Sequence, residues 1–210
     1  MTANSEEQDL KDRLSLIENM IAEGRRSTES YAWTFILWGV AYYVAIAWST
    51  WGFGWAIWAN NYVAWPVTMM SAFLLTWFLA IRKRIGKTGK QPATTAGRAI
   101  ASIWIAMGIS MFILLYSLGV SGKGNQQVFV AVIAAMLGTS NAASSMLLKW
   151  KQQFACALVW WAAAVASCFG TVEQSTIALV VAIFFCQIVF GIYGMVCEAR
   201  LRKQRGGSHA

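Results

Sequence analysis

The sequence feature that most constrains the fold is an uncharged stretch from residue 31 to residue 65, whose first part is almost continuously apolar. An α-helix rises 1.5 Å per residue, so about 20 residues cross a hydrocarbon layer of roughly 30 Å. We therefore interpret residues 31–51 as a membrane-spanning helix. The tryptophan-rich residues that follow contain Gly52, Gly54 and Asn60-Asn61, which indicates a bend at the far interface.

Five further apolar segments repeat this theme, at about residues 62–81, 99–119, 128–148, 152–170 and 175–197. Only 12% of the 210 residues are charged, against about 25% in an ordinary soluble domain. A soluble protein so poor in charge would expose large apolar patches. The sequence thus predicts an all-α membrane protein, a six-helix transmembrane bundle over residues 31–197. Because the connections are short, we expect sequence neighbours to pack as antiparallel hairpins.

The charges are distributed in a way that predicts the orientation. Net charge is +8, and every lysine and arginine except Lys123 falls in the N-terminal region 1–30, in the second or fourth connection, or in the tail 198–210. Positive residues flanking spans favour the cytoplasmic side. We expect both termini to be cytoplasmic, with the basic runs contacting anionic lipid. Such short runs between apolar segments do not indicate a nucleic-acid partner.

Residues 4–24 have the pattern of a short amphipathic helix outside the membrane. Its apolar residues follow a 4-3-4 spacing that places them on one face: Leu10, Leu14, Ile17 and Ile21. Two heptads are too few for a stable free coiled coil. Three arrangements stay open, which are docking under the protein's own bundle, binding a partner or a second copy, and lying on lipid. The acidic residues disfavour the third, because anionic headgroups repel them.

No Asp, Glu, Lys, Arg or His lies in any of the six segments, and this excludes several functions. Proton-coupled transporters use intramembrane carboxylates or histidines, haem needs an axial ligand, and intramembrane zinc or serine proteases need a metal cluster or a general base. The four cysteines show no CxxC spacing and are expected to be free, buried thiols. We therefore expect no catalytic residues, no metal, no cofactor and no enzymatic activity.

Neutral polar residues supply the candidate intramembrane site. Small residues recur at helical spacing in the fourth segment, which lets helix backbones approach closely: Ala131, Ala135, Gly138, Ala142 and Ser145. Beside them Asn141, and in the sixth segment Gln187, lie near mid-bilayer. An amide without a partner in hydrocarbon costs several kcal/mol, so both should face inward where the fourth and sixth spans meet. They serve either as interhelical hydrogen-bonding groups or, with Ser145, as a solute site.

Tryptophans are concentrated between the first two segments. Those at 48, 51, 55, 58 and 65, with Tyr62, follow a 3-4 spacing. Tryptophan and tyrosine favour the membrane interface because the ring is apolar and the polar tip stays wet. The simpler interpretation is a belt of aromatic residues at the membrane interface. The more specific one is an aromatic cage for a cationic or flat ligand.

Residues 17–39 contain the runs Met-Ile-Ala-Glu-Gly-Arg-Arg and Leu-Trp-Gly. This stretch resembles the opening of a family of uncharacterised bacterial six-span, multi-pass inner-membrane proteins, which begin with a short acidic helix and a similar first span. The resemblance implies a bacterial inner-membrane protein of unknown activity, of a kind often considered together with transcriptional regulators. It supplies no site residues.

The sequence therefore predicts a non-enzymatic membrane protein that serves as a scaffold, an accessory subunit or a signalling partner. The candidate partner-binding face is that of the N-terminal helix. The alternative is a transporter or channel for a neutral or hydrophobic solute, using Asn141, Gln187 and Ser145. The oligomeric state stays open at this stage.

Overall fold

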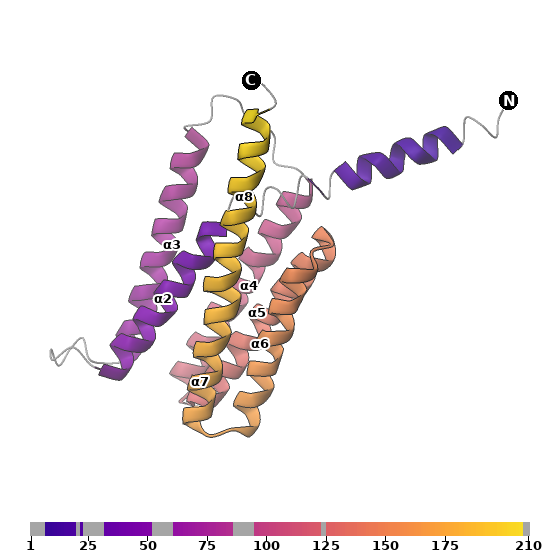
Figure 1. The fold of residues 1–210 in the computed structure, drawn as a ribbon. Helices are drawn as coiled ribbons and strands as arrows, with labels where there is room; N and C mark the ends of the chain where they lie inside the picture. Colours follow the sequence, from indigo (N-terminus) through magenta and orange to yellow (C-terminus); the bar gives the residue numbers. More distant parts are fainter. Residues whose placement is uncertain are drawn as a thin grey trace.

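A computed structural model describes residues 7–19, 22, 32–51, 61–85, 95–122 and 125–207. Every regular element in these ranges is helical. Residues 7–19 form a helix, followed by α2 (Ala32–Trp51), α3 (Asn61–Ile85), α4 (Thr95–Val120), α5 (Gln126–Leu148), α6 (Lys151–Phe169), α7 (Val172–Ile183), the π-helical turn η1 (Phe184–Val189) and α8 (Phe190–Gly207). The last three run on without a break and form one long rod (Figure 1).

Six helices in the described residues are long and apolar enough to cross a membrane. They are Ala32–Thr50, Ala64–Arg82, Gly97–Leu118, Gln126–Leu148, Lys151–Phe169 and Val172–Arg200. Each contains most of one predicted segment, so the prediction of a six-helix membrane protein is confirmed at this level. Helices suit this environment because all their internal backbone groups are hydrogen-bonded within the element.

Local capping groups fix where the later helices begin and end. Asn125 accepts a hydrogen bond from the backbone N–H of Val128 and starts α5. Thr171 and Gln174 form a capping box at the start of α7. Between α5 and α6, Lys149 adopts a left-handed conformation with φ of 49°. These caps satisfy backbone groups that would otherwise lack partners at helix ends.

The α5–α6 pair forms the most extensive interface of the bundle, and its small residues make that possible. A Cβ placed at Gly138 would overlap the indole ring of Trp161. At the turn, the backbone N–H of Trp150 donates to the carbonyl of Ser145 over 2.9 Å. Two members of the small-residue stripe predicted for the fourth span, Gly138 and Ser145, therefore lie where α6 packs against α5.

A second close approach joins α2 to the last rod. An added Cβ at Gly191 would lie 2.6 Å from Ile36 Cγ1, and one at Gly194 would lie 2.6 Å from Ala32 Cβ. Farther along, the Tyr43 hydroxyl donates to the carbonyl of Val180 over 2.9 Å. Glycines thus allow α2 and α8 to touch almost backbone to backbone.

The helices α3 and α4 lie on the outside. Among the described residues the former packs against α2 and the latter against α5, and no close backbone approach joins α3 to α4. For this pair the expectation that sequence neighbours pack as antiparallel hairpins stays a prediction. Each helix also contacts a second neighbour through aromatic side chains, Trp65 against Phe129 at 4.9 Å and Trp104 against Phe35 at 5.8 Å. Many of their large apolar residues, such as Phe112, are exposed and suited to lipid.

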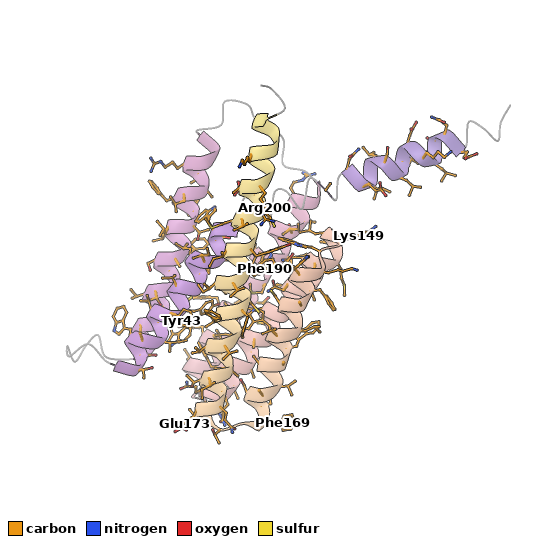
Figure 2. The ribbon with its side chains drawn as sticks, in the orientation of Figure 1. Tyr43, Lys149, Phe169, Glu173, Phe190 and Arg200 are labelled. Carbon is orange, nitrogen blue, oxygen red and sulfur yellow. The ribbon has the colours of Figure 1, made fainter. Side chains whose placement is uncertain are left out.

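The two ends of the bundle differ in charge. Figure 2 shows Lys149 and Arg200 toward one end, and Phe169 and Glu173 at the other. We call the first the basic end. The helix of residues 7–19 stands clear of the bundle beyond this end (Figure 1).

The glycine contact predicts how the bundle responds to added volume. Replacing Gly138→Leu should lower the thermal midpoint of the purified protein, since overpacking costs about 1–3 kcal/mol. Gly108→Leu is the matched control, because an added Cβ there meets nothing within 4 Å. Thermal unfolding in detergent compares the two. Equal midpoints for the two variants would contradict the packing of α5 on α6.

Candidate functional site

Polar side chains are collected in the interior of α5, α6 and the last rod. Eight of them are at most 3% exposed: Ser140, Asn141, Ser144, Ser145, Gln153, Ser167, Ser175 and Gln187. The expectation that Asn141 and Gln187 face inward agrees with their burial. The interior of the bundle therefore contains a set of neutral polar groups beside its apolar core.

The hydrogen bonds of Asn141 and Ser145 stay within their own helix. The Asn141 Nδ2 group donates to the carbonyl of Leu137 over 2.8 Å, and the Ser145 hydroxyl donates to the carbonyl of Ala142 over 2.7 Å. Asn141 Oδ1 is buried and has no protein partner. The hydrogen bond of Asn141 therefore does not join two helices, although the interhelical interpretation expected such a bond. The hydroxyl of Ser145 likewise bonds within its own helix.

Gln187 is the other amide of the predicted intramembrane site. It belongs to η1 and sits against α2, where an added Cβ at Gly39 would lie 2.8 Å from Gln187 Cβ. In the described residues α5 packs against α7, which belongs to the sixth span, whereas η1 packs against α2 and α6. The fourth and sixth spans therefore meet through α7, and the hypothesis that they meet at Asn141 and Gln187 stays a prediction.

Gln153 is the site residue that the sequence interpretation missed. It is completely buried, and neither its Nε2 nor its Oε1 has a protein partner. It lies near the start of the fifth predicted segment, residues 152–170. The signal that could have found it is helical spacing, since it shares the buried face of α6 with Ala157 and Trp160.

Gln153 and the polar residues of α5 belong to the same end of the α5–α6 hairpin. The Trp150–Ser145 hydrogen bond and the Gly138–Trp161 contact set the register of the two helices. The first turn of α6 therefore runs beside the last turns of α5. We call Asn141, Ser144, Ser145 and Gln153 the hairpin polar cluster.

The chemistry of the hairpin polar cluster is neutral. Two amides and two hydroxyls offer both donors and acceptors but no charge. The Oγ of Ser144, like both polar atoms of Gln153, is buried without a protein partner. Within the described ranges no three His, Cys, Asp or Glu side chains gather in a way that could hold a metal ion. Such a group suits water or a neutral hydrogen-bonding solute.

The cysteines add one internal contact. All four are free thiols, and the Cys186 Sγ lies 3.4 Å from the carbonyl oxygen of Cys156, to which it donates. This contact ties η1 to α6. Cys168 is exposed, so the expectation that all four thiols are buried is wrong for this residue.

The apolar face of the N-terminal helix is uncovered. Leu10, Leu14 and Ile17 are 61%, 58% and 52% exposed, respectively, while Ile21 lies outside the described residues. The expectation that this face docks beneath the protein's own bundle is therefore wrong for the part described. The polar side carries intrahelical ion pairs from Lys11 to Glu7 and from Arg13 to Asp9.

The tryptophan cluster is described only in part. Side chains at residues 51–63 lie outside the described part of the structure, so the belt and cage interpretations both stay predictions. Trp65 packs inward, with ring centroids 6.1 Å from Tyr42 and 4.9 Å from Phe129. This member of the cluster serves the attachment of α3.

Comparison of the chain with models of protein families, with curated proteins and with solved structures finds no match. The resemblance of residues 17–39 stays an expectation. The function has to be argued from the groups of this chain.

The hairpin polar cluster predicts an unusual response to loss of an amide. An unpaired buried amide destabilises a fold, so Gln153→Leu should leave the thermal midpoint unchanged or raise it. Asn141→Leu, the matched variant, removes an existing hydrogen bond and should cost about 1 kcal/mol. Thermal unfolding of both variants in detergent tests this. A midpoint that falls more for Gln153→Leu than for Asn141→Leu would contradict the assignment.

Proposed function

We propose that this chain is a non-enzymatic membrane protein that acts as a scaffold, an accessory subunit or a signalling partner through its N-terminal helix. The observation that carries the proposal is the uncovered apolar face of Leu10, Leu14 and Ile17. Burying a leucine or isoleucine side chain contributes about 1.5–3 kcal/mol. A helix that presents three of them on one face offers a binding surface for another helix.

The proposed setting is the bacterial inner membrane, with a bundle built largely of antiparallel hairpins and both termini in the cytoplasm. The basic residues support this orientation, because Arg82, Arg98, Lys149, Lys151 and Arg200 all belong to helix ends or connections at the basic end. The positive-inside rule assigns such an end to the cytoplasm. Anionic lipid is the partner that these residues suit, and the resemblance of residues 17–39 supports the bacterial assignment.

The apolar face of the N-terminal helix is better suited to binding another protein than to lying on the membrane surface. Over residues 7–19 the helix carries Glu7, Asp9, Asp12 and Glu18 against Lys11 and Arg13. Anionic headgroups attract cationic helices and repel acidic ones. The charge of the helix therefore favours a protein partner.

A second candidate function is binding or transport of a neutral solute at the hairpin polar cluster. The observation that favours it is Gln153, a fully buried amide whose polar atoms have no protein partner. A solute path would make Gln153→Leu abolish uptake of the solute while the thermal midpoint stays unchanged. A purely structural interior would leave transport unaffected by the same substitution.

The main proposal predicts that charge on the apolar face removes partner contacts. Leu14→Asp combined with Ile17→Asp should abolish the covalent adducts that an amine-reactive cross-linker forms in intact membranes. Insertion and thermal midpoint should stay unchanged, because the face is exposed in the monomer. Gel mobility of the tagged chain after cross-linking is the measurement.

The control for this experiment carries two changes on the opposite side of the same helix, Asp12→Ala and Asn19→Ala. Both positions are exposed, and neither belongs to the apolar face. Adducts should survive in this control. If the aspartate variant keeps the same adducts as the unmodified chain, the apolar face is not a binding surface.

A further inference from the structure

The apolar face of the N-terminal helix follows a heptad register. In the abcdefg notation, Leu10 and Ile17 occupy d positions, and Leu14 and Ile21 occupy a positions. The three described members are each more than half exposed. A helix with apolar residues at a and d forms a seam that pairs with another such seam.

The charged residues beside this seam complement their own copies. The same register places Glu6 and Arg13 at g, and Lys11 and Glu18 at e. In a parallel, in-register pair each g position faces the e position five residues later on the other helix, and such pairs select the partner. Arg13 then faces Glu18, and Glu6 faces Lys11. Two-fold symmetry repeats each opposite-charge pair.

The existing ion pairs of the helix do not oppose this arrangement. The Lys11–Glu7 and Arg13–Asp9 pairs are 2.7 Å and 2.9 Å long, and all four side chains are at least 60% exposed. Exposed pairs at this spacing contribute little to stability, because water and salt screen them. Replacing these intrahelical ion pairs with ion pairs between two helices, at a seam partly shielded from water, therefore costs little free energy.

We propose that the occupant of the apolar face is a second copy of this chain, paired as a parallel, in-register two-stranded coiled coil through Leu10, Leu14, Ile17 and Ile21. This inference rests on the proposed function, since it names the partner of the same face. Two heptads are too short to pair as free peptides. Membrane anchoring compensates for this short length. Insertion holds the helices of two copies at a high effective concentration and on the same side of the membrane, which favours their association.

The pairing is tested with the full chain in native membranes. Cys168→Ser and Cys197→Ser remove the two less buried thiols and leave the buried Cys156 and Cys186 in place. Leu14→Cys and, separately, Ile17→Cys are then added, and mild oxidation is followed by non-reducing electrophoresis. Each should give a covalent dimer, because facing a or d positions bring Cα atoms within the range that a disulfide spans. Asp12→Cys, on the outer side of the helix, is the control and should not.

Charge exchange gives an independent readout. In the Leu14→Cys background, Arg13→Glu should slow dimer formation severalfold, because it sets Glu against Glu18 of the other copy. Adding Glu18→Arg restores opposite charges and should restore the rate. The intrahelical Asp9 neighbour of position 13 is the same in both variants, so recovery reports the contact between copies.

The outcomes separate this inference from the proposed function. No dimer from either cysteine, or equal dimer from Asp12→Cys, would overturn the second copy as occupant. A second possibility is that the cysteine variants give no specific dimer, while the variant with Leu14→Asp and Ile17→Asp still loses cross-linked adducts. In that case the face binds a different protein and the proposed function stands. If that variant loses no adducts, both proposals fail.

Discussion

Close packing at small residues is the interaction on which the rest of this bundle depends. In a hydrocarbon layer, helices gain little by burying leucine against leucine, because lipid tails are equally apolar. Association then relies on shape, and this chain provides it at Gly138 for α5 and α6, and at Gly191 and Gly194 for α2 and α8. Phe190 links these two contacts, with its ring 5.2 Å from Phe35 and 5.0 Å from Trp150. The helices α3 and α4 pack on this centre from outside, α3 against α2 and α4 against α5.

The same close packing encloses polar groups that lipid would not accept. Thr68 and Ser167 hydrogen-bond to carbonyls one turn earlier in their own helices, so burial leaves their donors satisfied. Gln153 and Ser144 have no such protein partner, and for this reason they mark the part of the interior most suited to water or a neutral solute. The chain thus carries two separate candidate sites. One is the neutral hairpin polar cluster in the interior, and the other is the apolar face of the N-terminal helix outside the bundle.

The sequence predicted the spans well because hydrophobic length is a local property that hydrocarbon thickness fixes. It also placed Asn141 and Gln187 inside, since the cost of an unpaired amide in lipid allows little else. Pairing of the helices was predicted less well. The contact of Gln187 with Gly39 of α2 depends on how the helices assemble, and the π-helical turn around Gln187 has no sequence signature. Gln153 was missed because its place beside Lys151 resembles a polar connection. The uncovered face of the N-terminal helix depends on tertiary contacts that periodicity does not encode.

The proposed scaffold or signalling function depends on how the chain crosses the membrane, since the N-terminal helix must lie on the side where its partners are. The most direct test is the accessibility of single cysteines in intact cells to a thiol reagent that cannot cross the membrane. The positions are Glu173→Cys and Ser121→Cys at one end, and Lys151→Cys at the basic end, all of them exposed, in a chain whose native cysteines are replaced. The six-span bundle with a cytoplasmic basic end predicts labelling at positions 121 and 173 and none at 151 until the cells are opened. Labelling of position 151 from outside, with 121 and 173 protected, would contradict it.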